Sequence, residues 1–431
     1  MTPTVTEPRI SVPAHPAPYL QTGEVAIRYP SSDVWHPLNA LTLKRVKGVT
    51  EFNQSHQSEL TNNKSRLTDT LYKSLQLPNI AFFAGSGTSL KEPNGPSMWG
   101  LWVACMFNDG RDDGITDNVT QMTKEAKSIC DLVRYNELTN PNIEHFLSCC
   151  DAYQIVYQDE SVSSFIRKVK TQVLKLCSEF LDSDESDISA YRDLIRKLAK
   201  RRTRDPRLKV FTTNYDMCFE NASADLGMMI VDGFSYTRKR RFDGQYFNFD
   251  VVRRDNEGQS FIQGVIQLFK LHGSVSWERN GSEIFESQSP DPDNACLIYP
   301  AKGKYQQAFI QPHLELLSRF LEFLREPNSC LLMSGFGFND DHLSEPILSA
   351  VKSNPSFKLI VTDFSACSQI ANKNKYWKLL SAESLNGADV TFINASFKDI
   401  ASFIPNLAAL SPSEQLAKSL QIMSAGDMNN E

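Results

Sequence analysis

The chain lacks the features that mark several large classes of protein. None of its nine cysteines forms a Cys-x-x-Cys pair, which excludes a zinc ribbon and, with the odd count, indicates reduced thiols in a cytoplasm. The longest nearly apolar runs, such as residues 101–107, fall far short of the about 20 residues that a bilayer span needs. Residues 1–20 have neither a basic start nor an apolar centre, so we expect no secretory signal.

An excess of charge of one sign is also missing. Lys and Arg total 45 against 51 Asp and Glu, a formal net charge of −6. This balance gives no overall attraction to nucleic acid or to an anionic membrane, and we expect to find neither as a direct partner. The densest basic run has no interleaved aromatic residues and is interpreted as a solvated helix end or a contact between subunits. It comprises Lys197, Lys200, Arg201, Arg202, Arg204, Arg207 and Lys209.

What the sequence does contain is an alternation of apolar strands and helices. With 41% hydrophobic and 22% charged residues, 431 residues can bury a large core. Segments with the residue spacing of helices lie between the later strands. The pattern predicts an α/β fold with a Rossmann-like parallel sheet covered by helices on both faces. The runs typical of buried parallel strands are residues 80–84, 208–213, 265–271, 330–334, 359–362 and 390–393.

Other segments flank or interrupt the predicted core, which spans residues 67–405. Residues 1–66 are rich in proline and then polar, and are expected to form a mostly extended or loose arm, followed by a short helix from Leu67 to Leu77. Residues from about 100 to 205 have helical spacing and no strand signal, which predicts a helical insertion between the first two strands. A smaller polar insertion is expected at about 232–262, and a tail at 406–431.

The first polar motif follows the first strand directly. Gly85, Ser86, Gly87 and Ser89 lie in a turn whose glycines let a phosphate approach the backbone, and the next helix would offer N–H donors. The third glycine of the G-x-G-x-x-G pattern is missing at its usual spacing. By itself the turn therefore indicates a tight strand-to-helix connection at least as much as nucleotide binding.

Two further strands end in polar residues. Thr213, Asn214 and Asp216 follow the second strand, where open α/β sheets bind their ligands, although Asn214 and Asp216 are equally suited to cap the next helix. His272 stands at the tip of the third strand, and Gly273 leaves room beside it. A lone histidine at such a place is either a catalyst or a structural residue.

The sequence does not predict a metal site. His342 stands beside Asp340 and Asp341, but no third ligand lies at a suitable spacing. We therefore interpret these three residues as the start of a helix.

In their order and context the motifs resemble those of the sirtuin family. The turn from Gly85 to Ser89 resembles the sirtuin G-A-G-x-S loop. Residues 213–216 resemble its Q-N-x-D motif, and His272 with Gly273 resembles its catalytic H-G. Where sirtuins carry a glycine-rich turn that faces the adenosine, this chain has Gly335, Phe336, Gly337, Phe338, Asn339 and Asp340.

Departures from the pattern favour one branch of that family. Sirtuin deacylases carry a four-cysteine zinc module between the H-G motif and the later strands, where this chain has only Cys296 and then Cys330. Their P-D-F-R segment is replaced here by residues 96–99, Pro-Ser-Met-Trp, and the helical insertion is large. These features are similar to the sirtuin-like NAD hydrolases of bacterial anti-phage defence.

The resemblance implies an NAD glycohydrolase that releases nicotinamide and ADP-ribose, with NAD as its substrate and no metal. It implies that Asn214 holds the ribose or the attacking water, Asp216 accepts from the carboxamide, and His272 is the general base. The residues expected to bind NAD are Gly85, Ser86, Gly87, Ser89, Thr213, Gly335, Gly337 and Asn339, with the pyrophosphate at the first four.

The resemblance also implies a biological setting. Members of this group deplete cellular NAD during infection, and a cytoplasmic homo-oligomer or a complex with a HerA-like ATPase is expected. Two alternatives stay open. In the first, the chain is an NAD-dependent protein deacylase. In the second, it is a non-catalytic sensor of NAD or ADP-ribose that gates a partner.

Overall fold

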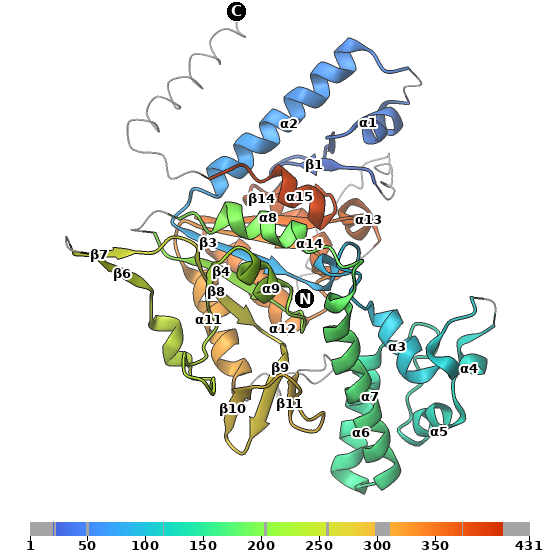
Figure 1. Cartoon of the computed structure of the whole chain (residues 1–431). Coiled ribbons are helices and arrows are strands. Elements are labelled where there is room, and N and C mark those ends of the chain that lie inside the picture. The colour runs from blue at the N-terminus through green and yellow to red at the C-terminus, as the bar shows by residue number, and fades with distance from the viewer. Residues whose placement is uncertain are drawn as a thin grey trace, which may run out of the picture.

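Figure 1 shows a computed structural model of the chain. It describes residues 20, 23–48, 51–114, 116–201, 205–255, 258–297, 311–372 and 374–407. Residues 1–19 of the predicted arm, residues 408–431 of the predicted tail, and Arg202 and Arg204 of the basic run lie outside these ranges. Within them, every helix is too short or too polar to span a bilayer.

A nine-stranded sheet lies at the centre of the molecule, in the order β2-β1-β14-β13-β12-β3-β4-β8-β5. All neighbours from β14 to β5 are parallel, and β1 is antiparallel to both of its neighbours. The six predicted strands and the predicted parallel α/β sheet are therefore confirmed. The strands are β1 (Ala26–Arg28), β2 (His36–Pro37), β3 (Asn79–Ala84), β4 (Leu208–Thr212), β5 (Met229–Val231), β8 (Val265–Lys270), β12 (Ser329–Ser334), β13 (Phe357–Asp363) and β14 (Val390–Asn394).

The order of the strands reverses beside β3. From β3 the chain adds β4 and β8 on one side, then returns to add β12, β13 and β14 on the other. This is the arrangement of doubly wound Rossmann sheets, whose ligands bind outside the carboxyl ends of the strands where the order reverses. The topology therefore directs attention to the ends of β3 and β12.

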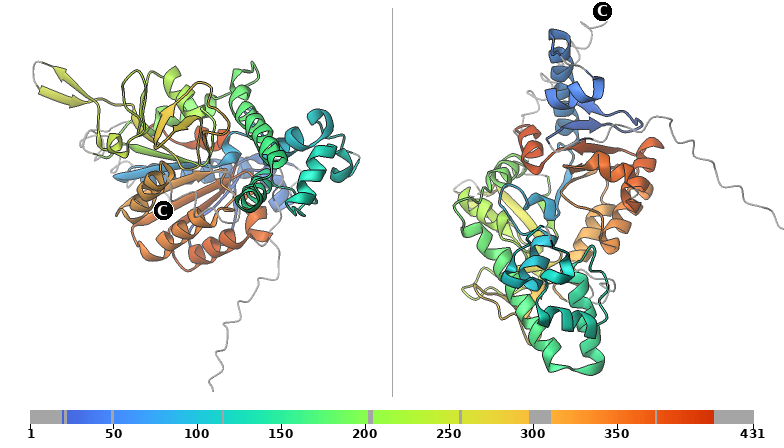
Figure 2. Two further views of the ribbon diagram at one scale, coloured as in Figure 1. Left: turned by 90° about the horizontal axis from the view of Figure 1, so that it is seen from below. Right: turned by 90° about the vertical axis from the view of Figure 1, so that its right-hand side faces the viewer.

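Helices cover both faces of the sheet, as the right-hand view of Figure 2 shows. In β3, Ile80 and Phe82 contact one apolar core, and Ala81 and Phe83 contact the other. A strand buried on both faces needs apolar residues at every position, which explains the continuous run. The first core is covered by α2 (Gln54–Ser74), α8 (Ser189–Leu198), α9 (Cys218–Asp225) and α15 (Phe397–Phe403), and the second by α11 (His313–Arg325), α12 (Asp341–Ser353), α13 (Ala366–Ala371) and α14 (Lys375–Leu385).

Between β3 and β4 lies a helical group with a core of its own. Trp102, Phe146 and Phe165 are buried in this core, which also receives Val275 and Leu297 from two strands of a small second sheet. Helix α8 falls within the range predicted for the insertion but packs on the central sheet instead. The group contains α3 (Met98–Met106), α4 (Asn118–Gln121), α5 (Lys124–Leu132), α6 (Ile143–Tyr157) and α7 (Glu160–Glu179), and the small sheet contains β9 (Gly273–Asn280), β10 (Glu283–Glu286) and β11 (Ala295–Leu297).

The structure differs from the predicted N-terminal arm. Helix α1 (Ala40–Lys47) forms within it, and α2 begins at Gln54, well before the predicted start at Leu67. Asn53 and His56 form a capping box at the start of α2, with the side chain of each hydrogen-bonded to the backbone N–H of the other. The first turns of α2 face solvent almost all round, so the sequence there shows no apolar periodicity to predict a helix.

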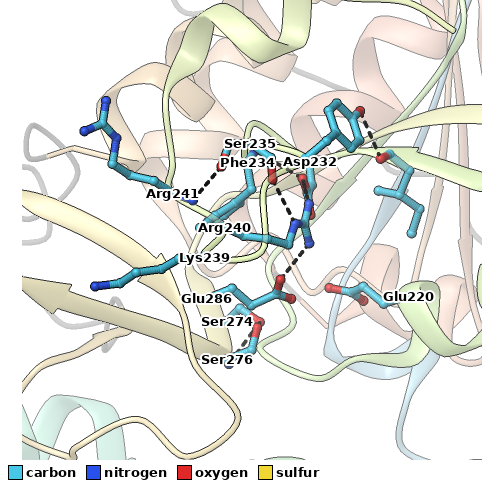
Figure 3. Close-up of polar contacts among 12 residues, drawn as sticks. Glu220, Asp232, Phe234, Ser235, Lys239, Arg240, Arg241, Ser274, Ser276 and Glu286 are labelled. Carbon is cyan, nitrogen blue, oxygen red and sulfur yellow. Dashed lines mark hydrogen bonds and ion pairs between the residues drawn. The ribbon is translucent and has the colours of Figure 1, made fainter.

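The smaller polar insertion is held to β10 by Arg240 (Figure 3). Its Nη2 donates to both carboxylate oxygens of Asp232, at 2.7 and 2.9 Å, and its Nη1 donates to Glu286 Oε2 at 2.7 Å. Burial raises the pKa of Asp232, and the charge of Arg240 opposes this rise. The insertion contains η4 (Gly244–Asn248) and a hairpin of β6 (Val252–Asp255) and β7 (Gly258–Phe261).

Candidate functional site

A cavity of about 560 Å³ opens at the carboxyl ends of β12, β3, β4 and β8. Of the predicted site residues, the glycines Gly85, Gly87 and Gly335 are not among those that line it. The others do line it: Ser86, Ser89, Thr213, Asn214, Asp216, His272, Gly337 and Asn339.

The glycines of the turn after β3 are required by a neighbouring loop. A Cβ on Gly85 would lie 2.4 Å from the carbonyl oxygen of Gly335, and one on Gly87 would lie 2.7 Å from the Cα of Gly335. Gly335 itself has a φ of +65°. The two loops therefore meet backbone to backbone, and the Gly87 N–H donates to the Gly335 carbonyl at 2.9 Å.

The predicted helix after this turn is wrong in position. The turn continues as a three-residue 3-10 helix, η1 (Ser86–Thr88), and the next α-helix, α3, begins only at Met98. Pro93, Gly95 and Pro96 stand between the two, and proline cannot continue a helix. A helix N-terminus directed at a phosphate is therefore not formed directly after the turn.

The side chain of Asn214, which follows β4, contacts the turn after the neighbouring strand β3. Its Nδ2 donates to Thr88 Oγ1 at 3.1 Å and to Ser89 Oγ at 3.0 Å, and its backbone N–H donates to Thr212 Oγ1 at 3.0 Å. The side chain is buried, and its Oδ1 accepts no hydrogen bond from any described residue. A buried amide oxygen without a donor is costly, so Asn214 Oδ1 is an acceptor left for a ligand.

Asp216 has a structural and a site contact at once. Its Oδ1 accepts from the Cys218 N–H at 3.1 Å at the start of α9, although the N-cap residue of that helix is Met217. Its Oδ2 accepts from Ser89 Oγ at 2.7 Å, which joins the loop after β4 to the turn after β3.

Tyr191 of α8 completes this network. Its hydroxyl donates to Thr88 Oγ1 at 2.9 Å and lies 2.8 Å from Ser89 Oγ. Burial raises the pKa of the Tyr191 phenol, so it stays protonated and can donate. A tyrosine at an apolar helix position carries no local signal of such a role.

His272 lies just beyond β8, and two other histidines contact it or the residue before it. Its ring stacks on that of His342, with 5.5 Å between the centroids and 24° between the planes. His342 is thus both in the first turn of α12, as predicted, and part of the cavity wall. His313 Nδ1 lies 3.2 Å from the Leu271 carbonyl, and burial lowers the pKa of His313 to about 4. His313 is therefore neutral and donates from Nδ1 to the residue before His272.

Residues of the helical group also line the cavity, which the sequence does not predict. Glu144 of α6 is buried, and its Oε1 accepts from the Tyr215 hydroxyl at 3.2 Å. Glu137 pairs with His145 at 2.8 Å. Asp340 and Asp341 also line the cavity, whereas no Lys or Arg among the described residues does. The wall is acidic, and a cationic or hydrogen-donating group suits it best.

Comparison with known families gives one match. Residues 208–385 match the family described as SIR2-like domain. This stretch, which is less than half of the chain, is similar to that family. It runs from β4 into the end of α14 and includes Asn214, Asp216, His272 and the loop after β12, and it excludes the turn after β3. It agrees with the sirtuin-like resemblance of those motifs. No curated protein matches the chain.

Solved structures of Sir2 proteins are similar at low identity. A triple mutant of a Sir2 homologue with 2′-O-acetyl ADP ribose is 12% identical, with a TM-score of 0.39, and covers 80% of this chain and 98% of its own. A structure concerned with the mechanism and regulation of Sir2 enzymes is 10% identical, with a TM-score of 0.35 and coverage of 79% and 97%. A Sir2 homologue in complex with NAD is 12% identical, with a TM-score of 0.36 and coverage of 77% and 90%.

Proposed function

We propose that this chain is an NAD glycohydrolase that cleaves the bond between nicotinamide and ribose. One observation carries the proposal: Asn214, Asp216 and His272 border a single cavity, and the buried Asn214 Oδ1 is left with no donor among the described residues. The SIR2-like match over these three residues supports NAD as the ligand.

The reaction needs little acid catalysis. The C1′–N bond breaks, the pyridinium nitrogen takes the electron pair, and nicotinamide leaves as a neutral molecule. The oxygen of a water molecule then bonds to C1′, and its proton passes to His272 and on to solvent. The protein must hold the pyrophosphate, stabilise the cationic sugar and place the water.

The described residues are assigned to these tasks as follows. Ser86 and Ser89, which border the cavity, hold the pyrophosphate, while Gly85 and Gly87 keep that turn close to the loop after β12. Asn214 Oδ1 accepts from a ribose hydroxyl or from the attacking water. Asp216 accepts from the carboxamide, and the acidic wall stabilises the positive charge that develops on the sugar as the bond breaks. The remaining NAD contacts are assigned to Thr213, Gly335, Gly337 and Asn339.

The wider role rests on the motif resemblance. We assign the enzyme to anti-phage defence, in which it depletes cytoplasmic NAD as a homo-oligomer or with a HerA-like ATPase. Unchecked loss of NAD is toxic, which is why such an enzyme requires a trigger.

Product analysis tests the reaction. The purified chain is incubated with NAD, with and without an acetylated peptide, and products are separated by chromatography. We expect nicotinamide and ADP-ribose without the peptide, and His272→Ala to form neither. Turnover that requires the peptide would identify a deacylase, and calorimetric binding of NAD without any product would identify a sensor.

A further inference from the structure

Lys270 is a buried cation that the assigned chemistry does not use. It is the last residue of β8, two positions before His272, and only 2% of it is exposed. Its backbone pairs with Thr212 at the end of β4. Burying an ammonium group is unfavourable unless other groups replace its water, so the contacts of Nζ show what it serves.

Those contacts join four segments around the site. Nζ donates to Glu220 Oε1 of α9 at 2.8 Å and to Ser274 Oγ of β9 at 2.8 Å. It also donates to two backbone carbonyls of the loop after β4, those of Tyr215, at 3.2 Å, and Asp216. Three ammonium protons are thus shared among four oxygens, an arrangement that a compact, rotatable donor can satisfy.

The two carbonyls belong to the segment that carries Asn214 and Asp216. The Tyr215 carbonyl accepts a second hydrogen bond from the Val275 N–H at 3.0 Å, so this segment is tied to β9 as well as to Lys270. The side chain of Lys270 therefore bridges the strand that ends before His272 and the loop that contains the other two assigned residues.

We propose that Lys270 is a positioning residue, which sets the place of Asn214 and Asp216 relative to His272. The expected effect of Lys270 on the rate rests on the NAD hydrolysis proposed above. A displacement of about 1 Å in such a constellation costs on the order of 10²-fold in rate. Lys270 acts through the backbone of the loop and is not itself at the reacting atoms.

The test compares Lys270→Met with Lys358→Met in the full chain. Methionine keeps the length of the side chain and removes its donors. Lys358 of β13 also has an ion pair, with Asp389, but near the amino end of its strand and away from the cavity. We expect Lys270→Met to lower kcat for NAD by about 10²-fold. We also expect exchange of the amide hydrogens of residues 214–218 to rise about tenfold, and Lys358→Met to change neither.

A double mutant separates positioning from general loss of stability. In the Asn214→Ala background, Lys270→Met should cost less in kcat than in the wild type, because one of the two residues through which it acts is gone. Equal costs in both backgrounds would overturn the proposal, and so would unchanged kcat and amide exchange in Lys270→Met. If Lys270→Met does not fold, Glu220→Gln takes its place. We again expect a lower kcat and faster amide exchange, and the proposal is overturned if neither changes.

The exchange measurement also keeps the two proposals apart. If the wild type does not cleave NAD, the proposed hydrolysis fails, while amide exchange still decides whether Lys270 holds the loop. If the wild type cleaves NAD and Lys270→Met does so equally well, only the role of Lys270 fails.

Discussion

The loops that follow β3 and β4 lie side by side at the carboxyl ends of these strands and contribute to the cavity in different ways. After β3, Gly85 and Gly87 pack against the backbone of Gly335 and do not line the cavity. After β4, Asn214 and Asp216 line it with their side chains. The glycine motif that resembles a nucleotide-binding signature is needed first for the contact between two loops, whereas the less conspicuous polar motif carries the chemistry.

The largest expected effect concerns the polar side of this comparison. Asn214→Ala and His272→Ala should each lower NAD turnover by about 10²–10⁴-fold, because an oriented general base or polar group is lost. Both variants should still fold, with a cooperative thermal transition. His36→Ala, on β2 and away from the cavity, is the matched control and should turn over normally. Near-normal turnover by either site variant would place the chemistry elsewhere.

A pH-dependent effect on stability is expected at His313, which contacts the backbone just after β8. The pKa of His313 is about 4 in the folded chain and near 6.5 when unfolded, so between these values the unfolded chain binds more protons. Stability is therefore lost as pH falls from about 6.5 to 4. Urea unfolding at pH 7 and at pH 4 should show His313→Gln losing roughly 3 kcal/mol less than the wild type over this range. Equal losses in the two chains would show that His313 does not titrate in this way.

A substitution in the glycine turn after β3 should lower the stability of the chain. Gly87→Ala places a Cβ 2.7 Å from the Gly335 Cα, so we expect a loss of about 2 kcal/mol in the free energy of unfolding. Gly100→Ala in α3, where the nearest atom is 3.4 Å away, is the control and should not destabilise the chain. Unchanged stability together with lost NAD binding would assign Gly87 to the ligand instead.

The smallest expected effect concerns Tyr191, whose hydroxyl contacts the turn after β3. Tyr191→Phe removes the hydroxyl that contacts Thr88 and Ser89, and should cost about 1 kcal/mol in thermal unfolding. Tyr157→Phe, at an exposed position on α6, should cost nothing. A loss no larger than that of the control would mean that the network does not depend on Tyr191.

How well the sequence predicted each part follows from how local its signal is. The strand runs could be predicted because a strand buried on both faces must be apolar throughout. The early start of α2 could not, because its first turns face solvent and leave no periodic pattern. The position of α3 was predicted wrongly because the glycine pattern outweighed Pro93 and Pro96, which delay the helix.

By itself, the sequence determined the parallel sheet and the polar residues at its strand ends, since burial and turn formation act on neighbouring residues. Only the tertiary structure decided that Gly85 and Gly87 meet Gly335, that His342 stacks on His272, and that the helical group and the start of α12 together give the cavity an acidic wall. Ser89 and Tyr191 stand 102 residues apart in the chain and 2.8 Å apart in the fold. Contacts of that kind depend on the path of the whole chain, and no local pattern of residues specifies them.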